Sequence, residues 1–103
     1  MLKALGEPTR LKIFNALLER RCCVRSLSKR LGISESAVSQ HLKVMREAGL
    51  IAGEKYGYHT HYRPQCEALE LLAADFEEMR RKAASADSGE TTCRCELKKE
   101  PLS

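Results

Sequence analysis

The chain has 103 residues, of which 43% are apolar and only 5% aromatic, so we expect one small domain with a thin core. It contains no run of eighteen apolar residues, and its N-terminus lacks the apolar segment of a secretory signal. This pattern argues against a membrane protein and favours a cytoplasmic one. A core this small also favours dimerisation, because a partner subunit adds buried area.

The formal net charge of +4 is unevenly distributed. Residues 20–63 hold nine Lys or Arg against three Glu, a local charge of +6, whereas the rest of the chain sums to −2. Basic residues concentrated in one stretch indicate a polyanionic partner, since each phosphate that they neutralise releases counterions.

The first part of the chain predicts two helices. Leu2 and Leu5 are one helical turn apart in a short apolar segment, which predicts a small helix. Pro8 is expected to begin a second helix, where its missing N–H costs nothing, with Glu7 as a mediocre cap. The apolar face of this second helix, which continues to Glu19, is predicted to be core scaffold. That face consists of Leu11, Phe14 and Leu18, with Ile13 and Leu17 beside them.

The stretch RSLSKRLGISESAVSQHLKVMREAGLI predicts a helix-turn-helix. We expect a short helix from Val24 to Leu31, a tight turn at Gly32, and then a longer helix. Ser34 stands where a hydroxyl can accept a hydrogen bond from a free backbone N–H at the start of the longer helix. Gly49 stands where a left-handed residue ends it.

The longer helix of this pair has two different faces. Its apolar face consists of Val38, Leu42 and Met45, with Ala37, Val44 and Ala48 beside them. Its polar face carries Ser36, Ser39, Gln40 and Lys43. Gln pairs bidentately with adenine, Ser suits several bases, and Lys reaches guanine or phosphate, so this face is predicted to enter the major groove of DNA. His41 falls on the apolar side and is interpreted as an interior histidine rather than a base reader.

Two strands, 51–56 and 58–64, are predicted around Gly57. A hairpin directly after a helix-turn-helix is a wing. His59 and His61 share one strand face at a spacing compatible with metal binding, but we interpret them as exposed wing residues. Phosphate contacts of the helix-turn-helix and the wing are predicted for Lys29, Arg30, Lys55, Tyr58 and Arg63.

Residues 66–84 have the most regular apolar repeat and predict a long helix. A helix of this length exceeds what a small monomer needs, so its stripe is expected to pack on its symmetry mate and on the N-terminal helix. The predicted dimer interface comprises Leu2, Leu5, Leu69, Leu72, Phe76 and Met79. Periodicity is lost from Ser85, so we divide the chain into a DNA-binding and dimerisation domain, 1–84, and a flexible Cys-containing tail, 85–103.

Five cysteines, an odd number, disfavour a closed disulfide framework and leave thiols for metal binding, redox chemistry or packing. Three thiolates suffice for As(III) or Sb(III), whereas Cd, Pb or Zn prefers three or four ligands. An extended segment from Ala84 to Cys93 spans at most about 33 Å, so Cys93 and Cys95 can reach Cys22 and Cys23. The alternative is that one of the latter two is a packed core residue and the other an idle surface thiol. Cys66 is interpreted as buried packing.

The motifs GEPTRLKIFNAL, AVSQHLKVMREAGLI and HYRP, in this order, resemble the ArsR/SmtB family of winged-helix repressors over residues 2–84. The resemblance implies a mainly α fold with a small β-hairpin, a winged helix-turn-helix that dimerises through its N- and C-terminal helices. It also implies a homodimeric, nucleoid-associated transcriptional repressor that binds a palindromic operator in double-stranded DNA. Release would follow binding of an inducer, often a thiophilic metal or metalloid.

Arsenite sensors of this family look like ELCVCDL before the reading helix, whereas this chain has RCCVRSL. Cys23 matches the first cysteine of that pattern, but Arg25 stands where the second belongs, so the site is not carried over whole. Cys22 adds a thiolate one position earlier, and Cys93 with Cys95 looks like a C-terminal variation. The family's zinc site, which uses His and carboxylates on the last helix, is absent because all three histidines precede that helix.

These patterns together predict an inducer, As(III) or Sb(III) above other thiophilic ions, held by Cys22, Cys23, Cys93 and Cys95. One alternative keeps the fold and makes the cysteines a thiol-based redox or persulfide sensor. A third, of another class, is a small thiol oxidoreductase or metal carrier. The chain has no C-x-x-C at a helix start and no nucleophile–base arrangement, so neither an enzyme nor an organic cofactor is expected.

Overall fold

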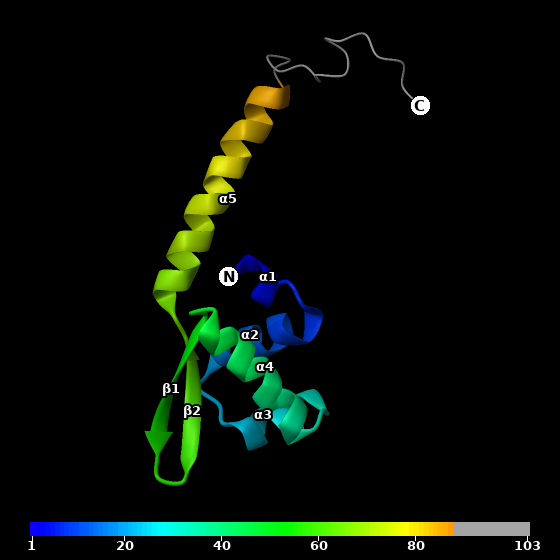
Figure 1. Ribbon diagram of the computed structural model, residues 1–103, viewed down its shortest axis with the longest axis vertical. Coiled ribbons are helices and arrows are strands. Elements are labelled where there is room, and N and C mark those ends of the chain that lie inside the picture. The colour runs from blue at the N-terminus through cyan, green and yellow to red at the C-terminus, as the bar shows by residue number, and fades with distance from the viewer. Residues whose placement is uncertain (88–103) are drawn as a thin grey trace, which may run out of the picture. The chain divides into compact units, whose positions relative to one another are not determined.

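The computed structural model describes residues 1–87 and places five helices and one hairpin within them (Figure 1). This order confirms the predicted fold class, a mainly α winged helix-turn-helix with a small hairpin. The elements are α1 (Leu2–Leu5), α2 (Pro8–Glu19), α3 (Val24–Leu31), α4 (Glu35–Glu47), β1 (Ile51–Tyr56), β2 (His59–Pro64) and α5 (Cys66–Asp87). No helix within 1–87 is both long and apolar enough to cross a bilayer. The chain forms two units, which divide between Leu72 and Ala73.

Local side-chain chemistry sets the start and end of the helices in the first unit. The Ser34 hydroxyl accepts a hydrogen bond from the Ala37 N–H at 3.1 Å, as predicted for the start of α4. Glu7 caps α2 better than expected, since its Oε2 accepts from the Arg10 N–H at 2.9 Å. That hydrogen bond is the main cause that lowers the pKa of Glu7. Gly49 has φ +79°, the left-handed conformation predicted for the residue that ends α4.

The core of the first unit lies where α2, α3, α4 and the start of α5 meet the hairpin. On α2 the buried side chains include Ile13, Phe14 and Leu17, whereas Leu11 and Leu18 are 44% and 53% exposed. The prediction of Leu11 and Leu18 as core residues was therefore wrong. Ile13, Ala16 and Leu17, at i, i+3 and i+4, define the buried face instead.

The hairpin pairs β1 with β2 in antiparallel register, from Ile51 opposite Pro64 to Tyr56 opposite His59. The second strand begins one residue later than predicted, because Tyr58 joins Gly57 in the turn, where Gly57 has φ +64°. The hairpin also holds the connection before α3, since the Tyr62 N–H donates to the Cys22 carbonyl at 2.8 Å. The wing and the thiol-bearing connection are thus hydrogen-bonded to each other.

Helix α5 runs to Asp87, three residues beyond its predicted end at Ala84. Residues 88–103, with Cys93 and Cys95, lie outside the described part. Leu72 is 6% exposed and belongs to the core of the first unit together with Ala68, so its own subunit already covers it. This burial contradicts its predicted place in the dimer interface.

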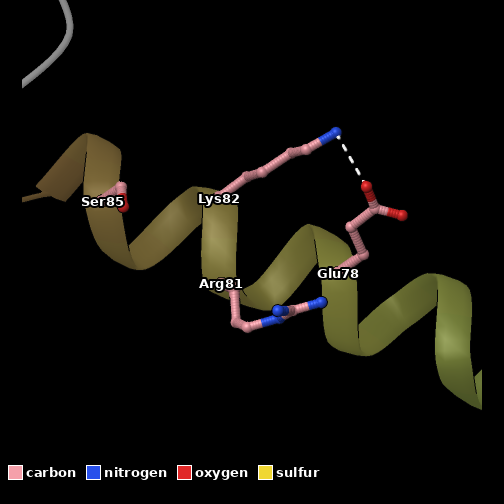
Figure 2. Close-up of a pocket in the computed structure, with 4 residues that line it drawn as sticks. All are labelled: Glu78, Arg81, Lys82 and Ser85. Carbon is pink, nitrogen blue, oxygen red and sulfur yellow. Dashed lines mark ion pairs between the residues drawn. The ribbon is translucent and has the colours of Figure 1, made fainter.

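The described residues of the second unit form the remainder of α5, with charged side chains paired along its surface. The Arg80 Nη2 lies 2.7 Å from the Glu77 Oε1, at a spacing of i,i+3. Glu78 and Lys82 are paired at 3.3 Å across one helical turn. Figure 2 shows this pair with Arg81 and Ser85, the residues that line a surface pocket. Phe76 and Met79, predicted dimer contacts, are exposed in the single chain. Apolar side chains thus lie at the surface of a helix that also carries two ion pairs, Glu77–Arg80 and Glu78–Lys82.

Candidate nucleic-acid interface and thiol pockets

The two faces of α4 separate as predicted. Val38, Leu42 and Met45 are fully buried against the rest of the first unit. The opposite face is solvent-exposed, and none of its predicted reading residues makes a side-chain hydrogen bond or ion pair within residues 1–87. These residues are Ser36, Ser39, Gln40 and Lys43. Only Val44 departs from the pattern, being 39% exposed although it was placed beside the apolar face. Packing on one side therefore fixes the orientation of a row of donors and acceptors on the other.

His41 lies between these faces, half-buried, and contacts the start of α2. Its Nδ1 is 3.4 Å from the Arg10 Nη1 and 3.7 Å from the Glu7 Oε2. Arg10 also donates from Nε to the Ala4 carbonyl at 2.5 Å, which joins α1 to the same cluster. The position agrees with the interpretation of His41 as an interior histidine, because the imidazole holds α4 against the N-terminal helices.

The predicted phosphate-binding residues differ in how available they are. Lys29, Lys55 and Tyr58 are exposed. Arg30 is hydrogen-bonded to the Glu19 carboxylate, and this bond raises the pKa of Arg30 and lowers the pKa of Glu19. The Arg63 Nε donates to Glu54 at 2.7 Å. Each of these two arginines is already held by a carboxylate, which competes with phosphate for the guanidinium.

A network on the wing was missed by the sequence reasoning. The Arg21 Nη1 donates to the Tyr56 hydroxyl at 2.5 Å, and that hydroxyl donates to Glu54 at 3.1 Å. Tyr56 also stacks on His61, with ring centroids 4.9 Å apart, while His59 is exposed as predicted. One contact of this network could have been predicted from a hairpin alignment. Glu54 and Arg63 have opposite charges and are diagonal neighbours in the register that pairs Glu54 with His61.

Cys22 and Cys23, adjacent in sequence, line different pockets. Cys22 is 5% exposed, and its Sγ donates to the Arg20 carbonyl at 3.5 Å. It lines a pocket of about 420 Å³ with Arg20, Ser26, Lys29 and Arg30. Cys23 is half-buried and lines a second pocket of about 510 Å³ with Val24, Arg25, Glu35, Tyr58, His59, Thr60 and Tyr62. Within 1–87, no cluster of three or more His, Cys, Asp or Glu is arranged to hold a metal ion.

Cys66 is exposed at the start of α5, so the interpretation of this residue as buried packing was wrong. Its Sγ donates to the Glu70 Oε1 at 3.5 Å, one helical turn away. The hydrogen bond to this carboxylate raises the pKa of the Cys66 thiol, and the negative charge of Glu70 adds to the effect. Cys66 therefore has less thiolate character than an unperturbed surface cysteine.

Comparison with known proteins relates this arrangement to bacterial regulators. The family described as "Bacterial regulatory protein, arsR family" matches residues 7–52, from the cap of α2 into β1. The HTH-type transcriptional repressor SmtB of Mycobacterium tuberculosis is 40% identical over 63 residues, which are 61% of this chain and 47% of that protein. The chain thus spans about half the length of the curated relatives that it matches first.

Solved structures extend the similarity over most of the chain. The crystal structure of a possible transcriptional regulator for arsenical resistance has a TM-score of 0.73 and 32% identity, and the match covers 89% of this chain and 96% of that one. Reduced HlyU from Vibrio cholerae is also 32% identical, with a TM-score of 0.63 over 76% of this chain and 82% of that one. These relatives are regulators rather than enzymes. With the helix-turn-helix, the wing and the sequence match in agreement, the chain belongs to the arsR family of bacterial regulatory proteins.

Proposed function

We propose that this protein is a transcriptional repressor that inserts α4 into the major groove of operator DNA. The single observation that carries the proposal is the exposed polar face of α4, whose side chains are unpaired within residues 1–87 while the opposite face is fully buried. A rigid helix with free hydrogen-bonding groups reads base edges without first losing internal contacts. The proposed base contacts are Ser36, Ser39, Gln40 and Lys43.

The cations around this face would contact the phosphate backbone. Lys29 and Lys55 are exposed, and Tyr58 at the tip of the wing adds a hydroxyl. Arg30 and Arg63 would exchange Glu19 and Glu54 for phosphate, so part of the gain offsets the lost ion pairs. Exposed ion pairs contribute little to stability, which keeps the cost of this exchange small.

We propose a homodimer on a palindromic site, with half-sites about 34–36 Å apart on one side of the duplex. The support is apolar surface left exposed by the single chain at Leu2, Leu69, Phe76 and Met79, with Leu5 half-buried. Sedimentation equilibrium tests this part. Phe76→Glu is expected to yield monomers, whereas Leu71→Glu, an equally exposed position outside the predicted stripe, is the matched control.

Fluorescence anisotropy on the tightest duplex selected from a random library tests DNA reading. Gln40→Ala is expected to weaken binding by about 1–3 kcal/mol, roughly 5–150-fold, because a bidentate base contact is lost. Lys12→Gln, on the exposed side of α2, removes one charge outside the proposed interface and is the control. Equal affinities of the Gln40 variant and the wild type would contradict the proposed orientation of α4.

For the inducer we propose a thiophilic ion, As(III) or Sb(III), bound through cysteine thiolates. Within the described part of the chain, no three His, Cys, Asp or Glu side chains are arranged to hold a metal ion. Cys93 and Cys95, outside that part, raise the number of available thiols to four. The presence of five cysteines in the chain supports the proposal, since soft ions select thiolate ligands. A coupling of about 1–3 kcal/mol would change operator affinity 5–150-fold.

Anisotropy titrations with As(III), Sb(III), Cd(II), Pb(II) and Zn(II) test the inducer. As(III) or Sb(III) is expected to weaken operator binding in the wild type but not in Cys22→Ser/Cys23→Ser, nor in a chain ending at Asp87. If no ion weakens binding of the wild type, the inducer proposal fails and DNA reading is unaffected. Mass spectrometry after peroxide, followed by chelation and gel filtration, separates the redox alternative, which alone leaves a covalent change on sulfur.

A further inference from the structure

One pocket is lined by Arg20, Cys22, Ser26, Lys29 and Arg30, and we name it the phosphoryl pocket. We propose that it binds a phosphoryl group, and that a group seated there covers the thiol of Cys22. The proposal rests on the proposed function in one respect, because the DNA backbone is then the nearest source of such a group. A free phosphate has the same chemistry and is the other source to be tested.

The lining residues match what a phosphoryl group requires. Ser26, Lys29 and Arg30 stand at i, i+3 and i+4 on α3 and so share one face of that helix. Arg20, from the connection after α2, adds a third cation. The pocket of about 420 Å³ has three cationic side chains and one hydroxyl in its lining, with no carboxylate among the lining residues. Cations and hydroxyl donors gathered in one concave site bind phosphate through charge-assisted hydrogen bonds.

The cations of the phosphoryl pocket are only partly neutralised by the protein. Arg30 is held by Glu19, just outside the lining. Within residues 1–87, neither Arg20 nor Lys29 forms a salt bridge or a side-chain hydrogen bond. Two cations are therefore available without exchange. This arrangement predicts weak binding of a free phosphate and tighter binding of a backbone phosphate that other contacts of the same duplex hold in place.

Cys22 connects this pocket to the thiol chemistry of the chain. The residue is 5% exposed, and the phosphoryl pocket is the cavity that it lines. Its side chain is close enough to Arg30 to add, after the hydrogen bond and the charge of Glu19, to the raised pKa of that guanidinium. A phosphoryl group held by Arg20 and Lys29 would therefore stand between the Cys22 thiol and solvent. Occupancy and modification of Cys22 are expected to exclude each other.

Competition between alkylation and occupancy tests the proposal on the full chain. Iodoacetamide labelling is followed by peptide mass spectrometry, with the exposed Cys66 as internal reference, at constant ionic strength. Three samples are compared: protein alone, protein with inorganic phosphate, and protein saturated with the selected duplex. The ratio of Cys22 to Cys66 labelling is expected to fall several-fold with duplex in the wild type and in Lys12→Gln. It is expected not to fall in Arg20→Gln/Lys29→Gln saturated with the same duplex.

A second measurement keeps the test decisive if Cys22 resists the reagent in every sample. Backbone amide shifts of residues 26–30 are followed in ¹⁵N spectra, and they are expected to move with ligand in the wild type and not in Arg20→Gln/Lys29→Gln. If protection of Cys22 or amide shifts appear only with duplex, the DNA backbone supplies the phosphoryl group. If inorganic phosphate produces the same effects, free phosphate also binds the phosphoryl pocket.

Two results separate this proposal from the proposed function. If the duplex binds by anisotropy but changes neither the labelling ratio nor the amide shifts, the phosphoryl pocket is wrong and DNA reading is retained. If phosphate protects Cys22 while no duplex binds, the pocket is retained and the proposed function fails.

Discussion

Helix α4 carries the proposed DNA-reading face, and the connection from Arg20 to Cys23 carries two of the proposed inducer ligands. Different forces set the side-chain environments in these two regions. In α4 both boundaries and both faces, apart from the exposed Val44, follow from local pattern: the Ser34 cap, the left-handed Gly49 and an apolar stripe at helical spacing. In the connection, two adjacent cysteines line different pockets, because the chain there is extended and bridged to Tyr62 of the wing, and successive side chains of an extended chain point to opposite sides. Periodicity predicts the environment of a side chain in a helix, whereas long-range pairing decides it in a connection.

The largest effect expected from this comparison is a loss of stability confined to one face of α4. Leu42→Ala is expected to reduce the free energy of unfolding by about 2–5 kcal/mol, since it leaves a cavity in the core. Gln40→Ala, two positions away on the exposed face, should change it by less than about 0.5 kcal/mol. Urea denaturation monitored by circular dichroism measures both. Similar costs for the two variants would mean that the faces of α4 are not separated as described.

The next largest effect is a difference in stability between serine variants of the two adjacent cysteines in the connection. Cys22→Ser is expected to cost about 1–3 kcal/mol of unfolding free energy, because it places a hydroxyl where a thiol is almost fully buried. Cys23→Ser, at a half-buried position, should stay within about 0.5 kcal/mol of the wild type. Thermal unfolding under reducing conditions compares them. A reversed order would contradict the different burial of these neighbours.

A smaller effect is expected at the start of α4. Ser34→Ala removes the acceptor for the Ala37 N–H and should cost about 1 kcal/mol. Ser36→Ala, at the second residue of the helix and exposed, is the matched control and should be neutral or slightly stabilising, because Ala is the better helix former. Differential urea midpoints resolve the pair. An equal response would show that α4 does not depend on its cap.

The smallest effect is a pH dependence at the wing. The hydrogen bond from Arg63 is the main cause that lowers the pKa of Glu54 below its ordinary value of 4.5. A carboxyl with a lowered folded pKa stabilises the protein above pH 4.5, and that contribution is lost as the pH falls through the lower value. Glu54→Gln is therefore expected to flatten the acid limb of the stability profile, and added salt should reduce the difference. A profile unchanged by Glu54→Gln at low salt would contradict this assignment.

The sequence predicted most of the fold because its signals are local. Pro8, Ser34 and Gly49 mark helix boundaries through backbone chemistry that needs no tertiary contact, and the alternation around Gly57 predicts the hairpin. It misjudged positions where packing decides, such as Leu11 and Leu18, which proved exposed, and Leu72, which proved buried within its own unit.

The candidate site was predictable to the same degree. The reading face of α4 follows from helical periodicity, so its exposed residues were found in advance. The wing network was missed because Arg21 and Tyr56 lie 35 positions apart and meet only through the fold. Likewise, spacing alone does not tell that Arg20 and Lys29 line one pocket with Cys22.

The salt dependence of duplex binding tests the central claim, that the outward face of α4 and the cations around it bind DNA. Equilibrium constants are measured by anisotropy from low to high salt on the selected duplex. The account predicts a linear decrease of log K with log salt, with a slope of about −3.6 per subunit if Lys29, Arg30, Lys55 and Arg63 each neutralise one phosphate. A salt-independent affinity, or no affinity for any duplex in the library, would contradict it.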